Sequence, residues 1–148
     1  MESLEGWTLD EAAIIDYIRK TYPDADILTA GSGTFFSLDP DKHWPNFATL
    51  VTSDDYDSAS NLSRSGIYRL NIGVSTATFE RLVGSMPDPD YTALDRVLPH
   101  PVYAAQHWLS ILNPSHATFE STVKPLLDEA HERLARSRRR LAAGKLEI

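Results

Sequence analysis

The chain has 148 residues, of which 42% are hydrophobic and 24% are charged, values that are typical of one folded domain and exclude disordered and fibrous classes. It has no cysteine, so disulfides, thiolate metal sites and a cysteine nucleophile are excluded. The formal charge of −7 is uneven, because residues 1–132 carry 8 basic and 20 acidic side chains whereas residues 133–148 carry 6 and 1. We therefore expect the body to repel nucleic acid and the C-terminal end to attract it.

The sequence shows no targeting or membrane segment. Residues 1–6 lack a basic stretch followed by an apolar run, and no window approaches the roughly 18 apolar residues of a membrane span. A cytoplasmic location is the expectation, without membrane association.

A first helix is predicted from about Thr8 to Lys20. Thr8 and Glu11 have the spacing of a capping box, in which two side chains bind backbone N–H groups at a helix start. Apolar residues then recur at helical spacing and are expected to face the core. They are Ala13, Ile14, Tyr17 and Ile18.

Short β-strands are predicted next. Residues 26–30 and 34–38 flank Gly31-Ser32-Gly33, a connector of the length that joins hairpin strands. Residues 47–52 are rich in β-forming side chains and are bounded by turn residues, which predicts a third strand.

The fourth predicted strand, residues 66–72, alternates between polar and apolar positions. Arg69 and Asn71 share one face, and Leu70 and Ile72 share the other. This alternation indicates a strand that is packed on one side only.

The second half of the chain predicts a short helix, a long connection, a strand and a long helix. Ser75 or Thr76 caps the short helix, which Gly84 ends. Residues 85–101 hold four prolines and form the connection, with one helical turn near residues 93–97. Residues 102–112 predict one bent strand or two strands.

The terminal helix is expected to begin near Ser115 to Thr118. Pro125 removes a backbone donor from it, which predicts a kink or a position in the first turn.

These elements predict one α+β domain over residues 1–148. About five mainly antiparallel strands pack against the N-terminal helix and the long C-terminal helix. Residues 136–148 are expected to be a basic tail that can fray.

Three segments carry a resemblance to known families. Residues 47–57, residues 68–74 and the stretch from His100 to Ser115 resemble an uncharacterised bacterial family recorded as a domain of unknown function. A His-Trp strand followed by a C-terminal helix is also similar to the MmcQ/YjbR family. That similarity implies a compact fold shared with CyaY-like proteins, a double-wing arrangement with a suggested DNA-binding role, and no catalytic residues.

The pair His107-Trp108 is the first candidate site. In a β-strand the two side chains point to opposite faces. The preferred interpretation is a core tryptophan with His107 at the sheet edge, since large aromatic residues are usually core residues. A pocket under the 85–101 connection is the alternative, where Trp44, Tyr103 and Trp108 converge. The candidate ligand-binding residues are His107, Trp108, Tyr103, Trp44 and His43.

Other motifs point to no defined chemistry. The five histidines follow no known metal-ligand spacing, and residues 54–57 lack the glycine and distal glutamate of a calcium loop. Gly31-Ser32-Gly33 has neither the nucleophile elbow of a hydrolase nor the Gly-Lys-Ser/Thr end of a phosphate-binding loop. A flexible hairpin turn explains it more simply.

A basic cluster near the C-terminus is the candidate nucleic-acid site. Such cations also stabilise a helix C-terminus without any ligand, which is the preferred interpretation. The cluster, with one lysine upstream, comprises Lys124, Arg133, Arg136, Arg138, Arg139 and Arg140.

We therefore expect a non-enzymatic domain that binds a small molecule or a protein partner, without a metal or cofactor. One alternative is DNA binding through the Arg-rich C-terminal helix. The other is a metal site or enzyme that uses His43, His100 and His107.

Overall fold

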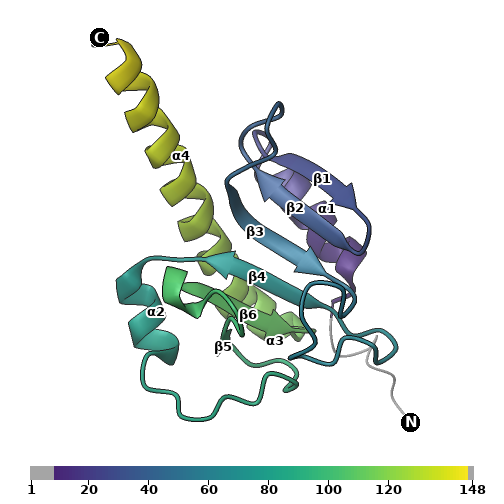
Figure 1. Cartoon of the computed structure of the whole chain (residues 1–148). Helices are drawn as coiled ribbons and strands as arrows, with labels where there is room; N and C mark the ends of the chain where they lie inside the picture. The colour runs from purple at the N-terminus through teal and green to yellow at the C-terminus, as the bar shows by residue number, and fades with distance from the viewer. Residues whose placement is uncertain (1–8, 147–148) are drawn as a thin grey trace.

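Six strands form one sheet in which all neighbouring strands pair antiparallel (Figure 1). They are β1 (Asp26–Ala30), β2 (Gly33–Ser37), β3 (Asn46–Val51), β4 (Arg69–Gly73), β5 (Leu98–Pro99) and β6 (Trp108–Leu112). Their order across the sheet is β1-β2-β3-β4-β6-β5. This computed structural model describes residues 9–146. It confirms the predicted α+β class, with one strand more than expected.

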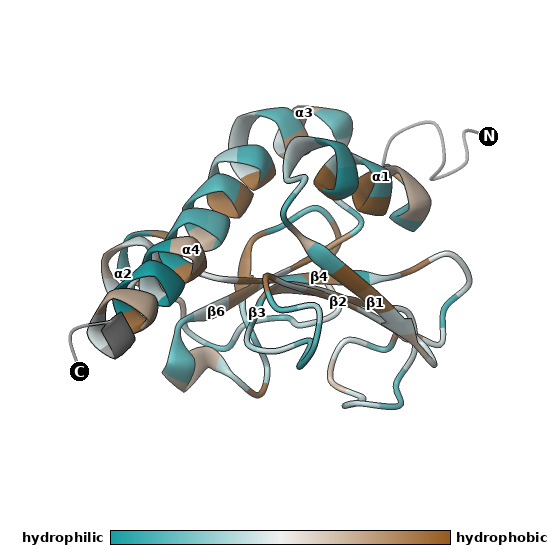
Figure 2. Cartoon of the chain, turned by 90° about the horizontal axis from the view of Figure 1, so that it is seen from above, coloured by the Kyte–Doolittle hydropathy of each residue, from teal (hydrophilic) through white to brown (hydrophobic). Residues whose placement is uncertain are grey.

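Helices cover one face of the sheet. They are α1 (Glu11–Thr21), α2 (Thr76–Val83), α3 (His116–Thr118), the π-helical turn η3 (Phe119–Val123) and α4 (Lys124–Leu146), whereas the 3-10 turn η2 (Ala104–Gln106) directly precedes β6. Figure 2 shows α1, α3 and α4 on one side of the sheet and loops on the other. The C-terminal part of α4 extends beyond the sheet (Figure 1).

The main core lies between the sheet and these helices. Leu70 and Ile72 of β4 point toward it, as the alternation of that strand requires. Ile14 and Ile18 of α1 and Leu127 of α4 meet them from the helical side, and all five side chains are buried. Burying each such side chain contributes about 1.5–3 kcal/mol, so this layer provides much of the stability.

The first helix starts later than the capping box predicts. Asp10 is the N-cap, and its side chain accepts a hydrogen bond from the backbone N–H of Ala13. The helix therefore begins at Glu11, and Thr8 lies outside the described residues. Ala13 faces solvent rather than the core, whereas Ile14 and Ile18 are buried.

Two strand predictions and one predicted helical turn need correction. The fourth strand begins at Arg69 instead of residue 66. Residues 102–106 form a turn and the 3-10 turn η2 instead of a strand. Residues 93–97 contain no helical turn, and the connection instead supplies β5, the added strand, which pairs with β6. Two residues are too short for a periodicity to be recognised.

The terminal helix departs from α-helical geometry just before its proline. Residues 119–123 form a π-helical turn in which the N–H of Lys124 donates to the carbonyl of Phe119. Pro125, the second residue of α4, has no N–H with which to continue the α-helical pattern. The predicted irregularity thus takes the form of a wider turn just before Pro125. Beyond it, α4 stays helical through the basic residues to Leu146.

Candidate functional site

The face of the sheet without helices carries polar side chains at its centre. Thr49 pairs with Asn71 across β3 and β4, and Asn71 pairs with Ser110 across β4 and β6. Arg69 lies on the same face and is only 2% exposed. The sequence pattern predicts this face to be solvent-facing, and that is wrong, because the loop of residues 52–68 and the segment of residues 100–107 cover it.

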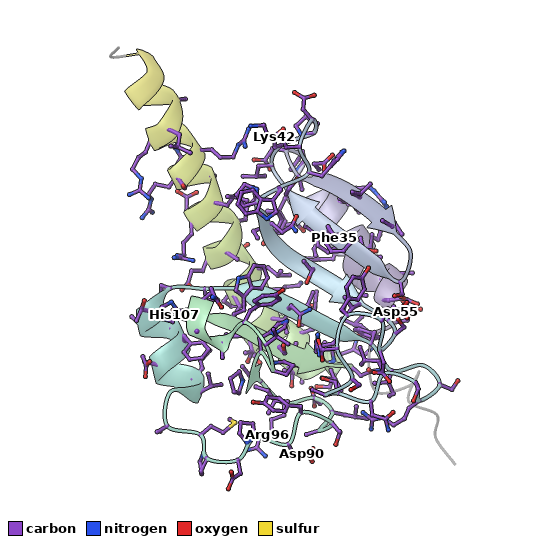
Figure 3. All side chains as sticks on the ribbon, viewed as in Figure 1. Phe35, Lys42, Asp55, Asp90, Arg96 and His107 are labelled. Carbon is purple, nitrogen blue, oxygen red and sulfur yellow. The ribbon has the colours of Figure 1, made fainter. Side chains whose placement is uncertain are left out.

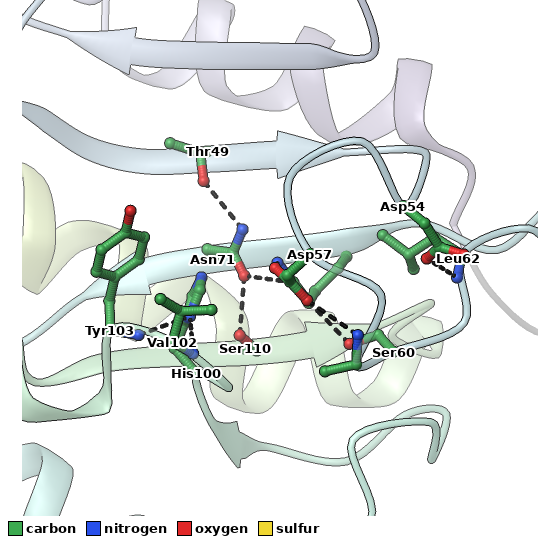
Figure 4. A network of polar contacts seen from close by, with 12 residues as sticks. Thr49, Asp54, Asp57, Ser60, Leu62, Asn71, His100, Val102, Tyr103 and Ser110 are labelled. Carbon is green, nitrogen blue, oxygen red and sulfur yellow. Dashed lines mark hydrogen bonds and ion pairs between the residues drawn. The ribbon is translucent and has the colours of Figure 1, made fainter.

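Hydrogen bonds join these polar residues into one network (Figure 4). Asn71 donates to the Thr49 hydroxyl over 3.0 Å, and its side-chain oxygen accepts from Ser110 over 2.8 Å and from Arg69 Nε over 3.0 Å. The Arg69 guanidinium donates to both carboxylate oxygens of Asp57, over 3.0 and 2.7 Å, and to the Ser60 hydroxyl over 2.9 Å. Hydrogen bonding from Arg69 lowers the pKa of Asp57, so the two charges compensate each other.

His100 lies beside this ion pair and is 4% exposed. Its Nδ1 accepts hydrogen bonds from the backbone N–H groups of Val102 and Tyr103, each over 3.0 Å. Backbone N–H groups only donate, so the neutral ring must carry its proton on Nε2. Burial, reinforced by the Arg69 charge, lowers the pKa of His100 to about 4, although Asp57 opposes the shift. The ring is therefore neutral near pH 7 and presents an N–H donor.

A cavity of about 550 Å³ opens above this network, and we call it the sheet cavity. Its polar lining comprises Asn46, Thr49, Asp57, Arg69, Asn71 and His100. Its aromatic lining comprises Phe35, Trp44, Tyr56, Tyr103 and Trp108. Aromatic walls with a few polar groups at the base are the usual composition of small-molecule sites.

Two glycines make room for the aromatic walls. A Cβ atom on Gly33 of β2 would lie 2.7 Å from the Tyr56 hydroxyl and 2.8 Å from the Phe35 ring. A Cβ on Gly73 of β4 would lie 3.1 Å from the Trp108 indole. Gly33 was interpreted as part of a flexible turn, but it belongs to a strand, and its missing side chain lets the aromatic rings lie against the sheet.

The tryptophans of the two His-Trp pairs, Trp44 and Trp108, both line this cavity. His43 and His107 each adopt a left-handed backbone conformation, with φ of 56° and 65°. Histidine is among the residues that tolerate this region better than most. Each histidine thus turns the chain just before Trp44 or Trp108.

The structure places the five predicted ligand-binding residues in two groups. Trp44, Tyr103 and Trp108 line the sheet cavity, whereas His43 and His107 do not. Trp44 is 67% exposed at the rim and Trp108 is half-buried, so the preferred interpretation of Trp108 as a core residue is wrong. Its ring faces the side without helices, where loops leave space.

The two histidines outside the cavity have other contacts. His43 Nδ1 lies 2.7 Å from the Asp26 carboxylate. His107 lies outside β6, contrary to the predicted strand, and its ring packs edge-on against Phe79 of α2. Figure 3 shows Phe35 on β2 and His107 at the turn beside α2.

The histidines do not converge. Within residues 9–146, no group of three or more His, Asp or Glu side chains could hold a metal ion. His131 bonds to Asp24 over 2.8 Å and His116 begins α3, both far along the chain from His100. The hypothesis of a histidine metal site therefore has no support in the described part of the chain. That part also has no helix both long and apolar enough for a membrane crossing.

The predicted basic cluster lies on α4, where carboxylates neutralise part of its charge. Arg136 and Arg139 both lie near Glu132, at 3.7 and 2.9 Å. Arg138 reaches Asp39 in the loop before β3, at 3.5 Å. Lys124 pairs with Glu120 over 2.8 Å. Arg133 and Arg140 are exposed on the same helix. A nucleic-acid role for these residues stays a prediction.

A second hollow, of about 1120 Å³, lies beside the start of α1. It is lined by Leu9, the first described residue, and by the loop of residues 62–68. Its lining mixes polar side chains with apolar ones, and Tyr68 is the one Phe, Tyr or Trp residue among the described lining residues. The sheet cavity is the better candidate, because it combines a buried ion pair with five aromatic side chains.

Comparison with protein families adds one finding. The profile of a family of unknown function, DUF6194, matches residues 9–143. The chain belongs to the DUF6194 family. No curated protein and no solved structure matches it. The DUF6194 match covers α1, the whole sheet and nearly all of α4, so it includes every lining residue of the sheet cavity.

Sequence reasoning missed the base of the cavity in this DUF6194 chain. Arg69 and Asn71 were assigned to a solvent face, and Asp57 was considered only as part of a segment that lacks the features of a calcium loop. The sequence did contain one indication of the base. A polar residue lies in each of three strands that are adjacent in the sheet, Thr49 in β3, Asn71 in β4 and Ser110 in β6. Polar residues aligned across the centre of a sheet indicate a buried network or a site.

Proposed function

We propose that this protein binds an uncharged small molecule with a flat ring in the sheet cavity, and that it does so without catalysing a reaction. The observation that carries the proposal is the arrangement of five aromatic side chains over a charge-compensated polar base. Aromatic rings attract flat apolar groups, and a neutral base imposes no strong preference for an ion.

The chemistry of His100 supports binding over catalysis. A general base needs a free lone pair at the position that faces its substrate. In His100 the lone pair of Nδ1 is occupied by two backbone N–H groups, and Nε2 carries the proton. The ring can therefore donate a hydrogen bond but cannot accept a proton at Nε2 without rearranging. The similarity to the MmcQ/YjbR family gives no further support, because no comparison finds it.

Trp44→Ala tests the proposal. Trp44 is exposed at the rim, so its removal should leave the fold intact and weaken the binding of flat fragments such as indole and 2-naphthol. A lost aromatic contact of about 0.5–1.5 kcal/mol corresponds to a roughly two- to tenfold weaker affinity. Ligand-observed saturation-transfer NMR titrations measure this change.

Leu141→Ala is the matched control, because Leu141 is 65% exposed on α4 and does not line the cavity. It should bind the same fragments as the unaltered protein does. Equal affinities for Trp44→Ala and Leu141→Ala, or no binding by the unaltered protein, would contradict the proposal.

A further inference from the structure

The hydrogen-bond acceptors at the base of the sheet cavity are engaged by the protein itself. The side-chain oxygen of Asn71 receives two hydrogen bonds, from Arg69 and Ser110. The Asp57 carboxylate receives two from Arg69 and one from the backbone N–H of Ala59, which uses most of its acceptor capacity. The side-chain oxygen of Asn46 is enclosed, out of reach of a ligand.

Donors at the base remain available. Thr49 accepts from Asn71, so its own hydroxyl hydrogen can point elsewhere. His100 Nε2–H makes no hydrogen bond to the described residues. Asn46 is the only described residue with a side-chain polar atom that is both enclosed and unpartnered. Nε2 of His100 is therefore not fully enclosed, although the residue is only 4% exposed, and the space that His100 lines is the sheet cavity.

Charge limits the ligand further. Arg69 and Asp57 form a bidentate pair, and His100 is a neutral donor, so the base holds no uncompensated charge. A cationic ligand would lose its hydration and meet two hydrogen-bond donors without an unpaired anion. An anionic ligand would lose its hydration without meeting an unpaired cation. A neutral ring that carries a hydrogen-bond acceptor avoids the desolvation cost of a cation and that of an anion.

We infer that the sheet cavity selects a flat, uncharged ring that carries a carbonyl oxygen, and that this oxygen accepts a hydrogen bond from His100 Nε2–H while the ring lies against Trp44, Tyr103 and Trp108. This inference rests on the proposed function and narrows it. A sugar fits less well, because its hydroxyls also need acceptors and the base offers few.

Three bicyclic probes of similar size test the inference. Coumarin carries a ring carbonyl, 2-naphthol carries a hydroxyl, and 2-naphthyltrimethylammonium carries a positive charge. NMR titration of the full chain should show the tightest binding for coumarin, and the His100 Nε2–H signal should shift as coumarin binds.

His100→Asn separates the hydrogen bond from the ring contacts. The asparagine oxygen can replace Nδ1 as the acceptor for Val102 and Tyr103. Its amide nitrogen then takes the place of Cδ2, so its N–H groups do not reach the position of the Nε2–H donor. Loss of one net hydrogen bond corresponds to a roughly three- to tenfold weaker affinity for coumarin. Binding of 2-naphthol should change little. His116→Asn, the same substitution at an exposed site outside the cavity, should change neither.

The outcomes are distinct. Tighter binding of 2-naphthol or of the cationic probe than of coumarin would overturn the inference and leave the proposed function standing. An unshifted His100 Nε2–H signal at coumarin saturation would also overturn it, and this measurement does not depend on any variant folding. Failure of all three probes to bind would overturn both the inference and the proposed function.

Discussion

His100 shows how one residue couples stability to pH. Its pKa is about 4 in the folded protein, below the ordinary value of 6.5, chiefly because the ring is buried. Between these values the unfolded chain binds a proton that the folded chain does not. The contribution of His100 to the free energy of unfolding is therefore fully present above pH 6.5 and is lost as the pH falls toward 4.

We predict that the free energy of unfolding falls more steeply over this range in the unaltered protein than in His100→Asn. A shift of this size corresponds to a difference of up to about 3 kcal/mol between pH 6.5 and pH 4. Urea denaturation at a series of pH values measures it. Parallel pH profiles for the two proteins would show that His100 does not titrate with a lowered pKa.

At the scale of elements, the Arg69–Asp57 pair fastens the loop of residues 52–68 onto β4. Arg69 is buried within the sheet, and Asp57 reaches it from the loop over 2.7 Å. Beside this pair, Leu62 and Ile67 of the same loop pack against Val51 and Leu112 in a second, smaller core. The polar and apolar contacts together close the face that has no helices.

Asp57→Ala is predicted to destabilise the fold by about 3 kcal/mol, because it leaves the buried Arg69 charge without a partner. The double variant Asp57→Ala with Arg69→Met should recover part of this loss, since neither charge then remains. Urea unfolding measures both. Asp16→Ala, which breaks the exposed Lys20–Asp16 pair, is the control and should cost less than about 1 kcal/mol. A loss for Asp57→Ala no larger than that of the control would contradict this account.

The elements with clear periodicity could be predicted from the sequence. Alternation in residues 69–72 and helical spacing at Ile14 and Ile18 identify the main core, because both patterns follow from burial on one face. β5 could not be predicted, since two residues have no period. The left-handed turn at His107 was missed because Val102 and Tyr103 are β-forming residues, and local propensity does not specify a 3-10 turn.

The cavity was predicted only in part, for a related reason. Its rim consists of conspicuous aromatic residues, so Trp44, Tyr103 and Trp108 could be proposed to converge from their residue types. Its base consists of Arg69, Asp57 and His100. The first two look like ordinary surface or loop residues in the sequence, and His100 was considered only for a metal site or an enzyme. These residues are buried or half-buried because loops fold back over the sheet. Such contacts join residues far apart in the chain, so the local sequence pattern does not predict them.

At the scale of the whole molecule, the sheet divides two environments. The helical face holds the main apolar core, and the other face holds the second core and the sheet cavity. Rigid strands thus support the base, whereas loops supply most of the rim. This arrangement is common in binding proteins, because a scaffold can keep its stability while loops determine what is bound.

The most direct test of the central claim is to map where a bound ring lies. Backbone amide signals should be recorded by ¹H–¹⁵N NMR during a titration with 2-naphthol, whose binding the proposed function requires. We predict concentration-dependent shifts at residues 44, 46, 100, 102, 103 and 108, around the sheet cavity. Shifts confined to residues 62–68 beside the second hollow, or to α4, would contradict the account, as would the absence of any shift.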